Sequence, residues 1–599
     1  MKLPTTIDFE TEAITDAGKP PKPVGVAIMY GGKALPVYYA WGHPTGNNCT
    51  KEEARRALRA VWGGPLLFHN AYFDLGVAMK WFGLPIPAEF HDTLFTLYLV
   101  DPHADTISLK PASEKHLGMP PEEQDAVRDW LIEHGIVRRG QKDWGAHIAQ
   151  APGDLVGVYA CGDVIRTKAL HDKLYPTLDA RMREAYDREV RLLPILMANE
   201  REGMRLDVGR LERDIKIYEA ALKKADFFLH RKLGPVNVDA PADVAKALKE
   251  KGIVTAFKKT PTGRDSTAKG NLTEDMFSDR EVYRLLGYRG RLETVLANSM
   301  RPWLAAVDGR GYIHTSWNQV RSTDTGGAKG TRTGRLSCSR FMNISKGWEG
   351  APTPRGKLPP LPLVRRYILP DEGCEMGVRD LSQQEFRLIA HFEDGDLMRA
   401  YQRNPKIDFH DNMKGLIQKV TGQDLPRKKV KALNFGLPYG MGLGRLAEAL
   451  ETDVDTARKL RDAQKQAAPG LFELDRSLKA LFREGKHIRT WGGRIYHVEA
   501  PKLIGNVMRS FEYKAISYLI QGSAADYTKE AIIRYSSMKK EGRFMVTVHD
   551  EIGVSIPVKA FDAEMAILRE AMNDVPGLDV PMLSDGKRGP NWADLKECL

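Results

Sequence analysis

Short apolar runs alternate with helix-like patterns along the first 185 residues. The runs at residues 24–30 and 65–68 are almost wholly apolar and have the length of buried β-strands. Residues 6–11 instead alternate polar and apolar side chains, which is typical of a strand with two different faces. Strands interleaved with helices predict a mixed α/β domain over residues 1–185.

The pattern becomes helical from residue 186 to about residue 310. Asp207 has the position and side chain of a helix N-cap, and apolar residues follow it at helical spacing. These residues are Leu211, Ile215, Tyr218, Leu222 and Leu229. An apolar face between charged flanks predicts a helix that packs on a neighbour.

Two stretches rich in turn-forming and basic residues follow, at 258–267 and 323–340. Both are predicted to be loops whose cations suit phosphate groups. The cations of the second stretch are Lys329, Arg332, Arg335 and Arg340. After proline-rich residues 352–362, a last large domain is predicted, with two strand-like acidic segments and a long helical block between them.

Composition limits the classes of protein that fit. The chain has 599 residues, of which 42% are hydrophobic, so it can form several packed domains. The net charge of +11 favours a polyanionic partner. The five cysteines are scattered, which suggests neither a disulfide framework nor a cysteine zinc site and favours a reducing compartment. No apolar run approaches the ~18–20 residues of a membrane span, so we expect a cytoplasmic protein without a membrane segment.

The first acidic signal is Asp8 and Glu10, which share one face of the predicted strand at residues 6–11. Two carboxylates on one face suit a divalent metal ion. A polar edge strand is the alternative.

Two further acidic signals follow in the same domain. Asn70 and Asp74 come directly after the apolar run at 65–68, and a capped helix start is the alternative for this segment, as it is for Asp92 further on. Tyr159 and Asp163 are four residues apart, which places a phenol and a carboxylate on one helical face.

In this order, D-x-E, N-x-x-x-D and Y-x-x-x-D resemble the three motifs of the DnaQ-like 3′→5′ exonuclease domains. The resemblance implies an RNase H-like fold in which two Mg²⁺ or Mn²⁺ ions activate a water and stabilise the leaving oxygen of a phosphodiester. It implies metal ligation by Asp8, Glu10 and Asp163, direct or water-mediated ligation by Asp74, and orientation of the attacking water by Tyr159.

In the last domain, two predicted strands each end beside acidic residues. Asp380 follows a strand-like start at residue 375, and Ser382 with Glu385 has the spacing of a capping box that opens a helix. Residues 544–556 contain two apolar runs that flank His549-Asp550-Glu551, which predicts a hairpin with these residues near its tip. Adjacent carboxylates favour a metal site, and a solvated turn is the alternative.

Between these segments, a basic and aromatic stripe recurs every four residues. Its members are Arg427, Lys431, Phe435 and Tyr439. The two cations could contact phosphates, and the two aromatic rings a base or sugar. The alternative is a basic amphipathic helix whose aromatic residues are buried. Pro438 has no amide donor, so the helix should kink or end near residues 436–437.

The three segments resemble motifs A, B and C of the family A DNA polymerases. The similarity extends to T-G-R-L-S at 333–337, to Q-G-S-A-A-D at 521–526 and to a thumb-loop-like stretch at 258–267. Leu381 and Gln384 depart from the commoner motif A residues. An exonuclease followed by a polymerase resembles a phage-type replicative enzyme or a large-fragment-like relative. A phage enzyme would act in the host cytoplasm.

The resemblance implies a role for each matched residue. Asp380 and Asp550 would bind two Mg²⁺ ions, with Glu551 in support and Mn²⁺ as a substitute metal. Arg427 and Lys431 would hold the incoming triphosphate. Phe435 would stack near the nucleotide, Tyr439 would lie by the templating pair and Glu385 would exclude the ribose 2′-OH. The primer terminus or its minor groove would be contacted by Arg335, Gln521 and His549.

The implied architecture is a multidomain α/β and α+β protein, with an RNase H-like exonuclease domain at 1–185 and a right-hand polymerase domain at 186–599. Within the latter, 186–310 would be mainly thumb, 311–392 and 522–599 palm, and 393–521 fingers. Primer-template DNA and dNTPs are the expected partners of a monomer, together with an unidentified processivity factor or replisome protein.

Three alternatives remain at this stage. A degradative or repair nuclease would use the C-terminal half only to grip DNA. A DNA-binding scaffold would need no metal, although eight clustered carboxylates would then repel phosphates. An RNA polymerase of the same superfamily would share the palm but lack the proofreading domain and the carboxylate at position 385.

Overall fold

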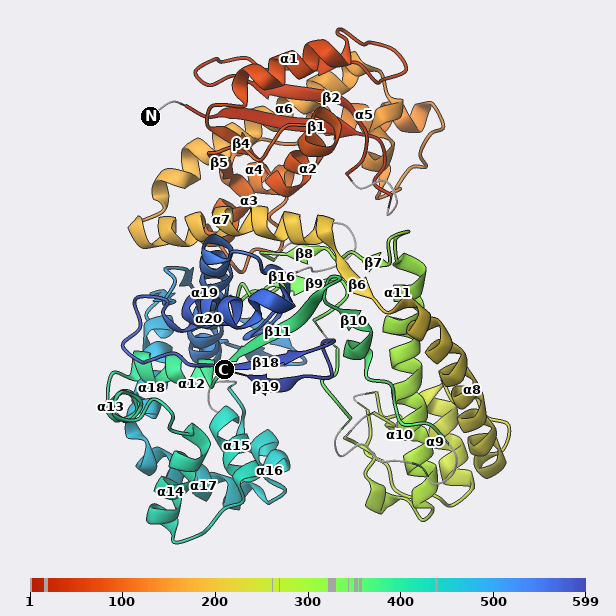
Figure 1. Ribbon diagram of the computed structural model, residues 1–599, viewed down its shortest axis with the longest axis vertical. Coiled ribbons are helices and arrows are strands. Elements are labelled where there is room, and N and C mark those ends of the chain that lie inside the picture. The colour runs from red at the N-terminus through yellow and green to blue at the C-terminus, as the bar shows by residue number, and fades with distance from the viewer. Residues whose placement is uncertain are drawn as a thin grey trace.

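The computed structural model describes residues 3–598 except 16–19, 261, 269, 322–329, 343, 349–353, 355–357 and 437–439. An N-terminal domain lies at the top of Figure 1, a second sheet lies in the middle, and two helical regions extend below it on either side. Within the described residues, no helix is both long and apolar enough to cross a membrane.

The N-terminal domain is built on a five-stranded mixed sheet in the order β3-β2-β1-β4-β5. The strands are β1 (Thr5–Thr11), β2 (Pro23–Met29), β3 (Val37–Ala40), β4 (Leu66–Phe68) and β5 (Phe90–Asp92). β1 pairs antiparallel with β2 and parallel with β4. The alternative of an edge strand at residues 6–11 is therefore wrong, because β1 is central and its backbone is paired on both sides.

Six α-helices lie in the described part of this domain. They are α1 (Lys51–Val61), α2 (Ala71–Phe82), α3 (Thr93–Val100), α4 (Leu109–Leu117), α5 (Glu122–Glu133) and α6 (Gly153–Leu174). α6 packs on β1, β2 and β3. The buried side chains of Ile7 and Phe9 join one core with Val26 and Ile28 of β2. This packing places the polar face of β1 against α6.

The long helix α7 (Ala180–Glu202) joins the N-terminal domain to the rest of the chain. It contacts α2 and α3 on one side and α19 (Ala515–Met538) on the other. In Figure 1 it runs between the two sheets.

A helical region follows α7 and lies at the lower right of Figure 1. It contains β6 (Met204–Leu206), α8 (Val208–Leu233), α9 (Pro241–Glu250), α10 (Arg280–Val295) and α11 (Arg301–Ala306). The predicted cap is confirmed, because the Asp207 side chain accepts a hydrogen bond from the Arg210 amide at 3.0 Å. α8 packs on α10, as its apolar face predicts.

The two predicted loops have little regular structure where they are described. An isolated bridge joins Lys259 to Asp265 in the first. In the second, residues 337–338 form the short strand β9 (Ser337–Cys338), and Lys329 lies outside the described residues.

The C-terminal sheet has the order β16-β17-β11-β18-β19 and is antiparallel throughout. Its strands are β11 (Cys374–Leu381), β16 (Arg543–Val548), β17 (Glu551–Pro557), β18 (Ser584–Gly589) and β19 (Lys596–Cys598). α20 (Phe561–Asn573) packs on β11, β17 and β18, and α19 packs on α20. The predicted hairpin is confirmed as β16 and β17.

A helical block lies between β11 and α19, at the lower left of Figure 1. Its helices are α12 (Gln384–Glu393), α13 (Asp396–Arg403), α14 (Phe409–Thr421), α15 (Arg427–Gly436), α16 (Leu443–Leu450), α17 (Val454–Ala467) and α18 (Pro469–Arg483). Two small hairpins follow, β12 (Ile488–Arg489) with β13 (Ile495–Tyr496) and β14 (Lys502–Ile504) with β15 (Val507–Arg509).

Candidate active sites

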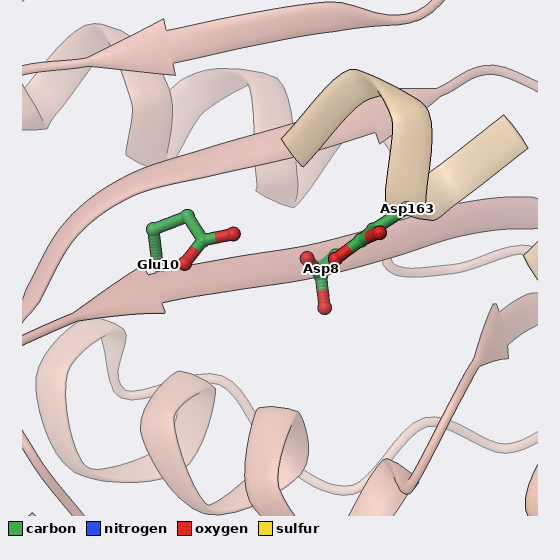
Figure 2. Close-up of side chains that lie close together, drawn as sticks. All are labelled: Asp8, Glu10 and Asp163. Atoms are coloured by element: carbon green, nitrogen blue, oxygen red, sulfur yellow. The ribbon is translucent and has the colours of Figure 1, made fainter. Parts of the chain in front are cut away.

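Three carboxylates converge in the N-terminal domain. Asp8 and Glu10 lie on β1, and Asp163 lies on α6, which packs across that strand. One oxygen of each carboxylate lies within 4.8 Å of the others, and Figure 2 shows Asp8 between Glu10 and Asp163. The structure thus brings the three side chains together, while their role as metal ligands stays a prediction.

Burial makes this cluster costly to ionise. It raises the pKa of Asp8 to about 8, and the carboxylate of Asp163 adds to the shift. Burial and the carboxylate of Asp8 raise the pKa of Glu10 well above its usual range. Like charges held out of water need either protons or a cation to compensate them. Three carboxylates whose oxygens lie within 4.8 Å of one another offer the hard donors that Mg²⁺ and Mn²⁺ prefer.

Lys110 is a basic residue that the sequence analysis missed. Its ammonium lies 2.8 Å from Asp163 Oδ2 and 3.7 Å from the centre of the Tyr159 ring. Burial and the Asp163 carboxylate raise the pKa of Tyr159 well above its usual range, so the phenol stays neutral and can donate a hydrogen bond. Lys110 lies on α4, and no local pattern around it indicates a site.

Asp74 lies in the first turn of α2 and accepts a hydrogen bond from the Phe9 amide at 2.9 Å. This bond ties α2 to β1 between the two predicted ligands. The capped helix start applies instead to Asp92, which accepts hydrogen bonds from the amides of Asn70, Ala71 and Leu94 at 2.8–2.9 Å. Asp92 therefore holds the starts of α2 and α3, and Asp74 remains a candidate ligand.

A second set of carboxylates lies at one end of the C-terminal sheet. Asp380 and Glu551 are directly opposite each other on β11 and β17. Lys346 Nζ lies 3.2 Å from Asp380 Oδ2 and 2.9 Å from Glu551 Oε2. One ammonium therefore bridges the two carboxylates at this end of the sheet.

Glu551 is held by more than Lys346. Its Oε1 accepts hydrogen bonds from Arg365 Nη1 and Trp592 Nε1, each at 2.8 Å. Burial opposes its ionisation, but Arg365 and Lys346 outweigh burial and hold the pKa of Glu551 below its usual range. These basic partners lie far from residue 551 in sequence, and no sequence signal identified them.

Asp550 and His549 form the turn between β16 and β17. His549 has a φ of +60°, an uncommon backbone conformation for a residue other than glycine. The Asp550 carbonyl accepts a hydrogen bond from the Leu381 amide at 3.1 Å, which ties the turn to the end of β11. Burial and the Asp380 carboxylate raise the pKa of Asp550 to about 7. The turn therefore adds a third carboxylate beside Asp380.

The capping box predicted from Ser382 and Glu385 is wrong. The N-cap position of α12 is Gln383, whose φ is +57°, so Ser382 lies one residue too early to cap the helix. The Ser382 hydroxyl donates instead to Asp585. Glu385 is in the first turn of α12, where it accepts a hydrogen bond from Arg335 Nη2.

Three residues of the basic and aromatic stripe lie on α15, and their contacts differ. Phe435 packs on Phe386 with ring centres 5.1 Å apart, and Lys431 is exposed with Nζ 5.9 Å from the Phe435 ring centre. Arg427 pairs with Asp408 at 2.6 Å and with Asp411. Among the described residues, no hydrogen bond or ion pair joins Arg427 or Lys431 to Asp380. Pro438 and Tyr439 lie outside the described residues, so the predicted kink stays a prediction.

Gln521 lies on α19, where its side chain donates to Ser517 Oγ at 3.0 Å. Partial desolvation of the His549 ring, together with the charge of Arg335, lowers the pKa of His549. Arg335 and His549 thus lie in one neighbourhood around Glu385, while the DNA contacts assigned to them and to Gln521 stay predictions.

Comparisons with known proteins agree with this arrangement. The sequence model of DNA polymerase family A matches residues 209–594. "DNA polymerase I" of Pseudomonas aeruginosa is 26% identical over 614 residues, covering 98% of this chain and 63% of that protein. "DNA polymerase DpoZ" of Acinetobacter phage SH-Ab 15497 is 26% identical over 574 residues, covering 88% of this chain and 87% of that protein.

A solved structure shares the fold. The POL domain of Pol1 from M. smegmatis, in complex with DNA primer-template and dNTP, matches with a TM-score of 0.77 and 21% identity over 99% of this chain and 96% of that chain. The mixed α/β multidomain fold with palm, fingers and thumb is therefore confirmed. The chain spans between half and two thirds of the length of the DNA polymerase I relatives it matches. Since the family match covers more than half of the chain, the protein belongs to DNA polymerase family A.

Proposed function

We propose that the protein is a DNA-templated DNA polymerase that adds dNTPs to a primer 3′ end by two-metal phosphoryl transfer. The observation that carries this proposal is the meeting of Asp380, Asp550 and Glu551 at one end of the C-terminal sheet. Mg²⁺ bound there would neutralise charge that develops on the reacting phosphate. The carboxylates of Asp380 and Asp550 would hold it, and Glu551 would stabilise the end of the sheet.

The residues around these carboxylates would select and align the substrates. Lys431 and Arg427 would bind the triphosphate, which requires Arg427 to exchange its partners on α14 for phosphate oxygens. Phe435 and Tyr439 would contact the nucleotide and the templating pair. Glu385, fixed by Arg335, would exclude a 2′-OH. Arg335, Gln521 and His549 would contact the primer terminus.

We also propose a 3′→5′ proofreading exonuclease in the N-terminal domain. It is supported by the cluster of Asp8, Glu10 and Asp163, of which Asp8 is half-buried and the other two are buried. Metal held there would supply a hydroxide nucleophile and stabilise the leaving oxygen. Asp74 would complete the donor set, and the neutral Tyr159 phenol would orient the attacking water.

The proposal extends to organisation and partners. The exonuclease domain would span 1–185 and the polymerase domain 186–599, with thumb at 186–310, palm at 311–392 and 522–599, and fingers at 393–521. α7 and α19 run through the limits at 185 and 521, so these domains share continuous helices. Primer-template DNA and dNTPs would be the substrates, Mg²⁺ the metal, and phage DNA replication the process.

A labelled primer on a longer template tests both activities. With Mg²⁺ and all four dNTPs, we expect the primer to lengthen to the end of the template. With Mg²⁺ alone, we expect it to shorten from its 3′ end. A primer that never lengthens would contradict the polymerase, and one that lengthens but never shortens would contradict only the exonuclease.

A further inference from the structure

Arg494 is a buried arginine between α3 of the N-terminal domain, the segment at Thr333 and α19. It follows Gly492 and Gly493 in the turn between β12 and β13, and 2% of its side chain is exposed. A buried guanidinium is costly unless its donors and its charge are matched. The partners of Arg494 therefore indicate why the residue is there.

The guanidinium binds two main-chain carbonyls from separate segments. Arg494 Nη2 donates to the Thr333 carbonyl at 2.9 Å and to the Gly522 carbonyl at 2.7 Å. Thr333 is two residues before Arg335, and Gly522 directly follows Gln521. One nitrogen thus fixes the backbone of both segments that we propose to contact the primer terminus.

Two phenols complete the arrangement. Arg494 Nη1 donates to the hydroxyls of Tyr98 and Tyr496 at 3.0 and 3.1 Å. Both hydroxyls donate in turn to the Arg332 carbonyl at 3.0 Å. Because Tyr98 lies on α3, this network ties the N-terminal domain to the segment that carries Arg335.

Charge and space also require an arginine here. Arg494 Nε lies 2.8 Å from Asp526 Oδ1, so the buried charge is matched. A Cβ on Gly334, whose φ is +74°, would lie 1.8 Å from Arg494 Nη1. The chain therefore approaches the guanidinium as closely as glycine allows. Lysine would keep the charge, but its single ammonium lacks the planar fork of nitrogens that binds the two carbonyls and the two phenols at once.

We infer that Arg494 is a positioning residue that holds Arg335 and Gln521 in register with each other and ties both to the N-terminal domain, an inference that rests on the proposed polymerase function. Arg335 donates to Glu385 and Gln521 lies at the next turn of α19 from Ser517, so neither touches Arg494 itself. The effect of Arg494 is exerted through the backbone. Minor-groove acceptors occupy similar positions in all correct base pairs. By fixing the backbone next to Arg335 and Gln521, Arg494 therefore sets where these two side chains can contact such an acceptor.

The test measures a contact between protein and DNA rather than activity alone. Primer extension is compared between a primer ending in guanine and one ending in 3-deazaguanine, which lacks the minor-groove N3 acceptor. All proteins carry Asp8→Ala and Glu10→Ala so that shortening does not interfere. In the parent we expect the deaza primer to reduce kcat/KM about tenfold, the size of one good base contact. In Arg494→Lys we expect this penalty to fall to about twofold or less.

Arg543→Lys is the matched control. Arg543 also binds a carboxylate and a main-chain carbonyl, at Asp371 and Gly203, away from the proposed DNA contacts. We expect it to keep the full penalty. If Arg494→Lys slows both primers equally and keeps the penalty, Arg494 has only a structural role and the inference is overturned.

Two further outcomes are informative. If Arg494→Lys does not fold, Tyr98→Phe with Tyr496→Phe keeps the guanidinium but releases the Arg332 carbonyl, and a smaller reduction of the penalty is expected. An unchanged penalty in that folded double variant overturns the inference. A parent that extends both primers equally well also overturns it, whereas a parent that extends neither contradicts the proposed polymerase function.

Discussion

At the residue scale, both candidate sites combine carboxylates with unusual backbone. Asn70, Gln383 and His549 all have positive φ, and each lies within four residues of a candidate carboxylate. Such conformations cost free energy and persist where the surrounding structure holds them. Local spacing singled out the carboxylates one segment at a time, and the family resemblance grouped them into two sites. Lys110, Lys346 and Arg365 could not, because they reach the sites through contacts distant in sequence.

Without bound metal, the acidic clusters should make the folded protein less stable as pH rises. The folded-state pKa of Asp8 is about 8 and that of Asp550 about 7, both above the ordinary value of 3.8. Between about pH 4 and pH 8 the folded state therefore binds more protons than the unfolded state, and these groups lower stability as pH rises. Mg²⁺ binds the ionised form, so it should raise the melting temperature more at pH 8.5 than at pH 5.5.

Calorimetry in EDTA and in Mg²⁺ at both pH values checks this prediction. Asp8→Asn is the comparison, because it removes one raised pKa and one donor. We expect it to reduce both the fall of the melting temperature with pH in EDTA and the gain with Mg²⁺ at pH 8.5. An equal Mg²⁺ effect at both pH values would contradict the prediction.

Glu385 gives a prediction about sugar selection. Since Glu385 does not cap α12, Glu385→Ala should change substrate choice rather than helix stability. We expect the ratio of kcat/KM for rNTPs to that for dNTPs to rise by about tenfold or more, which corresponds to at least ~1.4 kcal/mol of lost discrimination. Steady-state kinetics in the Asp8→Ala and Glu10→Ala background measures it. An equal loss for both substrates would reduce Glu385 to a partner of Arg335.

At the element scale, the apolar pattern predicted the strands at 6–11, 24–30 and 65–68, the helix after Asp207 and the hairpin at 544–556, but not which elements pack beside them. β1 was open to assignment as an edge strand because its parallel partner β4 begins about 60 residues later. The capping-box signature at Ser382 was also misleading, whereas a true capping box occurs at Thr50 and Glu53 before α1. The difference arises from the tight turn after β11, which moves the helix start to Gln383.

The two positions that the sequence offered as helix caps, Asp92 and Ser382, should therefore differ in their effect on stability. Asp92→Ala would leave three amides of α2 and α3 without their acceptor and should lower the free energy of unfolding by about 2–4 kcal/mol. Ser382→Ala should lower it by less than about 1 kcal/mol. Urea unfolding followed by circular dichroism compares them. Equal effects would contradict the assignment of the two helix starts.

At the scale of the whole molecule, the two candidate sites lie in different domains joined by α7. Composition and motif order predicted this division. They could not predict the buried contacts that link the domains, such as Arg494 with Tyr98, because buried polar networks leave no periodic signal in the sequence. We propose that each domain carries its own chemistry.

The most direct test of that claim is the labelled-primer assay on separate-site variants. Asp8→Ala with Glu10→Ala should abolish shortening and leave extension, while Asp380→Ala should abolish extension and leave shortening. Asp396→Ala, an exposed aspartate of α13, should leave both. If a folded variant of either site loses both activities, or if Asp380→Ala still extends the primer at the parent's rate, the account of two separate active sites is contradicted.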